Sequence, residues 1–313
     1  MTTYKEIRGT NIEAVASDPA NPVVGQVWYN TTTNVVKGFI NDPGSWSTGG
    51  ALNTARSALG DAGTQTSALA FGGAPGTKNE TESYNGTSWT EVNNLNTGNE
   101  DLAGCGASNT AALAVGGEIS PGVTAETETW NGTNWTEVGD LNTARAKLAA
   151  VGTNTASLAF GGGVAPADTE LWNGSNWTEV ADLNTGRVSN LAGVGSSTAA
   201  LAIGGNPANA QTELWNGTNW TEVNDLNSVR RYMAGAGTTT SAIVFGGSPA
   251  TDNTELYNGT NWTVGINLST QRQNLGGAGT NNTSALAFGG SSPVFSATEE
   301  WNAGPATITF SDS

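Results

Sequence analysis

Glutamates recur at one position of this sequence and are its most abundant source of acid–base chemistry. Each lies in the pattern Glu-x-aromatic-Asn, at Glu82, Glu128, Glu170, Glu213, Glu255 and Glu299. A glycosidase needs one particular pair of carboxyl groups a few ångströms apart in a cleft. The pattern indicates no carboxylate that breaks the repeat to form such a pair. The spacing therefore predicts structural glutamates and a protein that is not an enzyme.

Other side chains that carry catalysis or bind metals are scarce. The chain contains no histidine and one cysteine, Cys105, which excludes an imidazole base, a His-ligated zinc and a Cys₄ metal site. No loop spaces oxygen ligands as a calcium motif does. We expect no catalytic residue, no metal and no cofactor.

Charge and hydropathy narrow the possible partners. Asp and Glu number 27 against 11 Lys and Arg, a net charge of −16, which argues against nucleic acid and anionic membrane surfaces. No apolar run approaches 18 residues, so we expect no membrane insertion. The first residues also lack the apolar stretch of a secretory signal peptide.

Three markers repeat in one phase along the chain. An apolar run ends in Gly-Gly at Gly72 and Gly73, Gly116 and Gly117, Gly161 and Gly162, Gly204 and Gly205, Gly246 and Gly247, and Gly289 and Gly290. A Trp followed by Thr or Ser falls at Trp46, Trp89, Trp135, Trp177, Trp220 and Trp262. The glutamate pattern is the third marker. Together they indicate a repeat protein with a period of about 43 residues.

Each repeat reads as four short strands. Residues 148–151 and 156–160 are apolar runs, whereas 169–172 and 176–180 alternate and are separated by Asn173-Gly174. Asn-Gly between alternating runs predicts a hairpin with a type I′ turn, in which both central residues have positive φ. The repeat is therefore expected to be a four-stranded antiparallel meander.

Six such units cannot each bury a core alone, so we expect them to stack around an axis as a β-propeller. Small residues of the first strand are expected near the axis: Ala62, Cys105, Val151, Val194, Ala236 and Ala278. An arginine precedes the first strand and is expected to pair with the repeated glutamate: Arg56, Arg145, Arg187, Arg230 and Arg272, with Asn99 in the second repeat.

These markers resemble those of the kelch family. The Gly-Gly pair after the second strand, the aromatic residue on the third and the Trp on the fourth together cover about residues 51–310. The resemblance implies an all-β, kelch-like β-propeller of six four-stranded antiparallel blades over residues 51–313. The aromatic-to-Trp interval of five residues is shorter than usual in that family.

The two ends of the chain leave the blade count open. Trp46 is placed as on a fourth strand, yet residues 299–310 are expected to supply both a third and a fourth strand, with Ala306 in the place of Trp. Either six blades close and the N-terminal strands add outside, or residues 25–48 form a partial seventh blade. Six is the preferred count.

Residues 1–50 differ from the repeats. The segment 25–39, GQVWYNTTTNVVKGF, predicts a hairpin with TTTN at its turn. It resembles the leading module of bacteriophage virion proteins, especially fibre-like proteins. The resemblance implies that residues 1–50 dock to other virion proteins and that the protein is located in the virion after assembly in the host cytoplasm. Release of virus particles by lysis is one route out of the cell that needs no signal peptide. A homo-oligomer is possible.

Recognition is expected on one face of the propeller. Connections between strands 1 and 2, and 3 and 4, are short and uniform, whereas those between strands 2 and 3 vary: 74–81, 118–127, 163–169, 206–212, 248–254 and 291–298. Variable loops on a uniform scaffold are where binding is usually placed. The candidate side chains are Lys78, Asn79, Glu118, Asp168, Asn206, Asn209, Asp252, Asn253 and Phe295.

These features favour a non-enzymatic virion protein, of the tail-fibre or attachment type, that displays a propeller to a host-surface glycan or protein. Two alternatives remain. One is a purely structural decoration protein of the capsid or tail. The other is a cellular carbohydrate-binding lectin or carbohydrate-active enzyme.

Overall fold

The computed structural model describes residues 12–206, 210–249 and 251–310, which form strands and turns. The chain divides into two compact units. One combines Met1–Gly44 with Ala303–Ser313, and the other is Ser45–Asn302. Within the described ranges, no helix is long and apolar enough to cross a membrane.

The larger unit contains six antiparallel blades, and in the first five the neighbouring strands follow one another along the chain. The first comprises β4 (Gly60–Thr64), β5 (Ser67–Phe71), β6 (Thr81–Tyr84) and β7 (Trp89–Val92). The second comprises β8 (Ala103–Ser108), β9 (Ala111–Ile119), β10 (Gly122–Trp130) and β11 (Trp135–Glu137). The third comprises β12 (Ala149–Thr153), β13 (Ala156–Phe160), β14 (Thr169–Trp172) and β15 (Trp177–Glu179).

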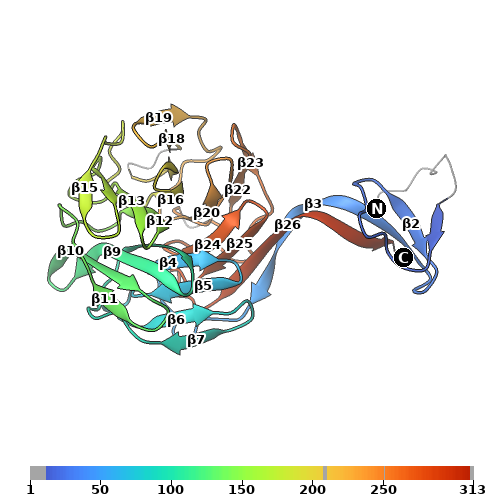
Figure 1. Cartoon of the computed structure of the whole chain (residues 1–313), viewed down its shortest axis with the longest axis horizontal. Coiled ribbons are helices and arrows are strands. Elements are labelled where there is room, and N and C mark those ends of the chain that lie inside the picture. The colour runs from blue at the N-terminus through green and yellow to red at the C-terminus, as the bar shows by residue number, and fades with distance from the viewer. Residues whose placement is uncertain (1–11, 207–209, 250, 311–313) are drawn as a thin grey trace. The chain divides into compact units, whose positions relative to one another are not determined.

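The fourth blade comprises β16 (Ala192–Ser196), β17 (Ala199–Ile203), β18 (Thr212–Trp215) and β19 (Trp220–Val223). The fifth comprises β20 (Ala234–Thr238), β21 (Ser241–Phe245), β22 (Thr254–Tyr257) and β23 (Trp262–Val264). Figure 1 shows the blades around a central axis, with the first strand of each blade innermost. The six-bladed propeller predicted from the repeats is confirmed.

The sixth blade joins the two ends of the chain. It contains β24 (Gly276–Asn281), β25 (Ser284–Phe288) and the start of β26 (Thr298–Phe310), and its outer strand is the end of β3 (Val35–Gly49). The expectation that residues 299–310 form two strands is wrong, because β26 continues without a turn. Trp46 on β3 takes the place of the missing fourth-strand Trp, so no seventh blade forms.

The hydrophobic core lies between neighbouring blades. In one cluster, for example, Cys105 and Leu113 of the second blade pack against Ala159 and Trp177 of the third. The fourth-strand Trp of the third blade is buried, and its indole N–H reaches the preceding blade: Trp177 Nε1 donates to Thr127 Oγ1 at 3.1 Å. Burial of these rings across each junction makes the blades depend on one another for stability.

The expected Arg–Glu pairs form inside the blades. Arg187 and Glu213 lie 2.8 Å apart with side-chain exposures of 0% and 2%. The corresponding pairs are Arg56–Glu82, Arg145–Glu170, Arg230–Glu255 and Arg272–Glu299. Burial lowers the pKa of Arg187, and Glu213 opposes that shift. In the second blade Asn99 replaces arginine and donates to the Gly116 carbonyl at 2.6 Å.

The Gly-Gly pairs adopt backbone conformations that other residues rarely adopt. Gly161 and Gly162 have φ of 70° and 105°. A Cβ on Gly162 would lie 2.8 Å from the carbonyl oxygen of Ala146. Both the positive φ and this close approach favour glycine.

The third-to-fourth strand turns differ from the predicted type I′ geometry. Gly132 has φ of 91°, whereas Asn131 stays at negative φ. The Asn131 Oδ1 accepts hydrogen bonds from the amides of Thr133 and Asn134, each at 2.9 Å. The turn is therefore a four-residue loop stabilised by its asparagine side chain, and only one residue needs positive φ.

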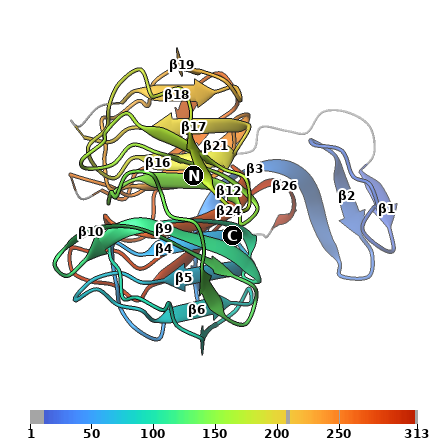
Figure 2. The ribbon, with the colours of Figure 1, turned by 60° about the vertical axis from the view of Figure 1, so that its left-hand side comes forward.

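The smaller unit is built around a hairpin. As predicted, β2 (Val27–Asn30) pairs antiparallel with the start of β3, and β1 (Glu13–Val15) adds in parallel to β2, which can be followed in Figure 2. Asp18 accepts hydrogen bonds from Trp28 Nε1, Asn30 Nδ2 and Lys37 Nζ. These bonds, that of Lys37 first, lower the pKa of Asp18 to about 2.

Candidate axial binding site

Six equivalent residues form a ring around the propeller axis, immediately before the first strands. They are Ala58, Asp101, Lys147, Asn190, Tyr232 and Asn274, and we call them the axial ring. All six have positive φ, from 45° to 63°. Each amide donates to the carbonyl of the preceding member at 2.8 to 2.9 Å, and the amide of Ala58 donates to Asn274. The backbone is thus uniform, while the side chains differ.

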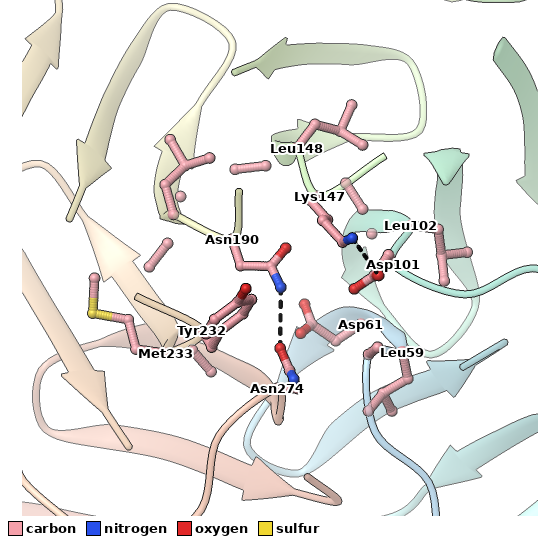
Figure 3. Close-up of a pocket in the computed structure, with 18 of the residues that line it drawn as sticks. Leu59, Asp61, Asp101, Leu102, Lys147, Leu148, Asn190, Tyr232, Met233 and Asn274 are labelled. Carbon is pink, nitrogen blue, oxygen red and sulfur yellow. Dashed lines mark hydrogen bonds and ion pairs between the residues drawn. The ribbon is translucent and has the colours of Figure 1, made fainter. Parts of the chain in front are cut away.

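The axial ring opens onto a cavity of about 110 Å³, which we call the axial cavity. The first strands and the residues just before them line it, and Figure 3 shows Asp61, Asp101, Lys147, Asn190, Tyr232 and Asn274 around it. Equivalent positions of the repeated backbone therefore carry different side chains: a carboxylate, an ammonium group, two amides and a phenol. Concave sites with a few differing polar groups are typical ligand sites.

An ion pair occupies one side of the axial cavity. Lys147 Nζ lies 3.4 Å from Asp101 Oδ2 and 3.9 Å from Glu118 Oε2. Burial raises the pKa of Asp101, and Lys147 and Asn190 oppose that shift. For Lys147, burial lowers the pKa, but Asp101 and Glu118 outweigh it and the net shift is upward. Lys147 therefore remains charged and is matched by two carboxylates.

Amide groups lie next to this ion pair. Asn190 Nδ2 donates to Asn274 Oδ1 at 3.0 Å, as Figure 3 shows. Tyr232 lies beside them, and the Arg231 guanidinium carbon is 5.3 Å from its ring centroid. The two amides and the phenol of Tyr232 supply hydrogen-bonding capacity without a charge of their own.

Asp61 on β4 is a carboxylate that breaks the repeat and that the repeated glutamates did not predict. The equivalent residues of the other first strands are Gly104, Ala150, Gly193, Gly235 and Gly277. Asp61 Oδ2 accepts a hydrogen bond from the Gly277 amide at 2.9 Å. Burial raises the pKa of its carboxyl to about 7, although the Gly277 amide opposes the shift. Aligning the six repeats position by position would have revealed Asp61 from the sequence, because the other five repeats have glycine or alanine there.

Asp61 also borders a second cavity along the axis, and we call the two cavities together the axial channel. This second cavity, of about 90 Å³, is lined by Asp61 and by small residues that include Ala62, Cys105 and Val194, which confirms their expected place near the axis. Burial raises the pKa of the Cys105 thiol to about 12, and its Sγ lies 3.0 Å from Ser157 Oγ. This thiol therefore stays protonated.

Of the residues proposed from the variable loops, Glu118 lies beside the axial cavity through its contact with Lys147. Asn206 Oδ1 accepts from Arg231 Nη1 at 3.0 Å, next to Tyr232 of the axial ring. Asn209 lies outside the described residues. The segment 118–127 is mostly strand, because β9 and β10 extend into it and pair up to Ile119 and Gly122.

The remaining loop candidates contact their own blade or the segment that leads into the next one. Lys78 Nζ lies 3.7 Å from Glu80, and Asn79 Nδ2 donates to the Leu95 carbonyl. The carbonyls of Asp168 and Asn253 accept from Gly161 and from Arg230, respectively. Asp252 accepts from Asn267, and the ring of Phe295 lies 6.0 Å from the Arg272 guanidinium carbon. Within the described part of the chain, no contact brings these six together, and their binding role stays a prediction.

Metal ligands are not grouped in the part of the chain that the structure describes, where no three His, Cys, Asp or Glu side chains come together. Hard cations such as calcium take six to eight oxygen ligands. The described carboxylates of the axial cavity, Asp61 and Asp101, fall short of such a set.

Comparison with known proteins bears on the fold. No protein-family model matches the sequence, and no curated protein matches it. A solved structure titled "Structure of YjhT", a kelch-type fold, is similar with a TM-score of 0.65 and 13% identity, over 83% of this chain and 97% of that chain. At this identity the likeness shows the fold alone. The fold is a kelch-like β-propeller of six blades.

Proposed function

We propose that this protein is a non-enzymatic bacteriophage virion protein whose propeller recognises the host surface through the axial cavity. The observation that carries the proposal is the axial ring. Its six backbone positions are equivalent, yet it presents Asp101, Lys147, Asn190, Tyr232 and Asn274 in one cavity. Recognition of one ligand orientation needs such an asymmetric surface with a few polar groups.

The chemistry of the cavity favours binding over catalysis. Lys147 is held by Asp101 and Glu118, so it is not poised as a nucleophile. The one group that favours the alternative of a carbohydrate-active enzyme is Asp61, because a carboxyl with a pKa of about 7 suits acid–base catalysis. A glycosidase would need a second carboxylate placed for the reaction, and Asp101 is already paired with Lys147.

The placement in a virion rests on the N-terminal hairpin. The segment 25–39 resembles the leading module of virion proteins, and it forms the β2–β3 hairpin of the smaller unit. The loop before β2 exposes Val23 and Val24, which are 68% and 59% exposed. Exposed apolar residues of this kind suit contact with other virion proteins. The same unit would dock equally well in a purely structural decoration protein. Host attachment and decoration therefore differ only in whether the propeller binds the host surface.

Competition for phage adsorption tests the proposal. Purified full chain should slow adsorption of the phage that carries it, and antibodies to the chain should label intact particles. Lys147→Met with Tyr232→Ala should abolish the competition. A matched control, Thr133→Ala with Thr218→Ala, changes exposed turn residues and should compete like the unchanged protein. Unlabelled particles would exclude the virion role, and labelled particles without competition would favour the decoration protein.

A further inference from the structure

We propose that the axial cavity binds a primary ammonium group, held by the carboxylate of Asp61. The inference rests on the proposed function and names the chemistry that the cavity would recognise on its ligand. It stands on three observations: the position of Asp61, the charges that surround it, and the one carboxylate oxygen left available.

The first observation is the place of Asp61 in the channel. Its side chain stands where the other five first strands carry only glycine or alanine, and it borders both axial cavities. The neighbouring strand lies very close, since a Cβ on Gly104 would be 2.2 Å from the Asp61 carbonyl oxygen. Asp61 is half-buried, so its carboxylate lies in the lining of the axial cavity with part of its surface left exposed.

The second observation is the charge around it. The cation of the cavity, Lys147, is already matched by Asp101 and Glu118. Among the described residues, none forms an ion pair with Asp61. The cavity lining thus carries two carboxylates, Asp61 and Asp101, against one ammonium, and the whole chain carries −16. An enclosed charge is costly without a partner, so a cationic ligand fits this site.

The third observation selects the kind of cation. Asp61 Oδ2 is occupied by the Gly277 amide, which leaves Oδ1 as the available acceptor. A guanidinium group binds best to both oxygens of a carboxylate at once, whereas an ammonium group is a compact charge that one oxygen can hold. The amides of Asn190 and Asn274 and the hydroxyl of Tyr232 border the same cavity and supply further hydrogen bonds.

Titration of Asp61 gives the binding a pH signature. Asp101 and Lys147 face the cavity from the axial ring with Tyr232, and Cys105 faces the channel from β8. The pKa of Cys105 is raised to about 12, so this thiol does not titrate near neutrality. Asp61, with a pKa of about 7, does. The charged carboxylate binds the ammonium group, and a lysine-type amine stays protonated well above neutrality. Affinity for the lysine probe should therefore rise as the pH increases through neutrality.

Calorimetric titration of the full chain near neutral pH tests the inference with matched pairs of probes. Glucosamine is compared with glucose, and Nα-acetyl-lysine amide with its Nε-acetylated form. We expect at least one amine to bind and both neutral partners to fail. Which amine binds tells whether the source is an amino sugar or a lysine side chain. Asp61→Asn should weaken binding by about tenfold or more, because it removes a charge-assisted contact.

The control variant is Glu222→Gln, which removes an exposed carboxylate on β19 and should bind the amine unchanged. Asp61→Asn keeps the side-chain shape, and its melting curve verifies folding. Absence of amine binding, equal binding of the neutral probes, full affinity in Asp61→Asn, or tighter binding of calcium at this site would each overturn the inference.

The adsorption assay separates this inference from the proposed function. If Asp61→Asn loses amine binding but competes normally for adsorption, the ammonium site stands and host recognition lies elsewhere. If no amine binds while Lys147→Met with Tyr232→Ala still loses competition, the cavity recognises the host through another chemistry. The ammonium site would then be wrong, and the proposed function would remain.

Discussion

The amide of Ala58 donates a hydrogen bond to the carbonyl of Asn274 at 2.9 Å. This bond joins the first blade to the sixth and completes a circle of six such bonds around the axis. Residues more than 200 positions apart in the sequence thus become neighbours in one ring. The same junction carries the contact between Asp61 and Gly277, so closure of the propeller also assembles the axial cavity.

Replacing Trp177 should destabilise the propeller strongly. The ring is 5% exposed and its Nε1 donates to Thr127 of the preceding blade at 3.1 Å. Trp177→Ala should lower the free energy of unfolding by about 3–5 kcal/mol, since truncating a buried ring leaves a cavity. Thermal unfolding followed by tryptophan fluorescence measures it, and Trp177→Phe should lose less. An unchanged Tm in Trp177→Ala would contradict the packing of the blades.

Gly162 and Gly163 form a matched pair for testing the Gly-Gly motif. Gly162 has φ of 105°, and a Cβ there would lie 2.8 Å from the Ala146 carbonyl oxygen. At Gly163 the nearest atoms to a Cβ are 3.8 Å away. Gly162→Ala should cost on the order of 1–3 kcal/mol through backbone strain, and Gly163→Ala should be tolerated. Chemical denaturation compares them, and equal stability of the two variants would count against the motif.

Breaking a buried Arg–Glu pair should cost more than removing both partners. Arg187 and Glu213 are 2.8 Å apart and almost fully buried. Glu213→Gln leaves the guanidinium without its counter-charge and should cost about 3–5 kcal/mol. A double-mutant cycle with Arg187→Met measures the coupling. Additive losses from the two single changes would mean that the pair contributes no interaction energy of its own.

Asp61 should make stability depend on pH. Its pKa in the folded protein is about 7, above the unfolded value of about 3.9, so folding favours the protonated form. The stability that this group contributes is full below the unfolded pKa, falls by at most about 1.4 kcal/mol per pH unit between the two values, and levels off above the folded pKa.

Asp61→Asn cannot ionise and should remove that dependence. Relative to the unchanged protein, the variant should gain most above neutral pH and little near the unfolded pKa. Urea unfolding at several pH values measures the difference, with Glu222→Gln as the control for a change in net charge. A stability difference that stays constant with pH would show that Asp61 has an ordinary pKa.

The sequence by itself determined the repeat and the kind of core, and it favoured six blades over seven. Gly161-Gly162 and Glu170 recur in phase in every repeat, and Trp177 recurs in all but the last, because each blade needs the same turns and packs against its neighbours in the same way. Asn173-Gly174 located the outer turn, although its geometry differs from the expected type I′. These are local requirements, so they are visible within one period of about 43 residues.

The tertiary structure decided the closure and the candidate site. Residues 299–310 had the pattern of two strands, but β26 continues without a turn, and the segment of β3 that carries Trp46, from the other end of the chain, completes the sixth blade. Asp61 and Lys147 are unremarkable in their own repeats. They come together only at the axis, because closure of the propeller brings residues one or more periods apart into a single cavity. A charge that is removed from water there needs a partner.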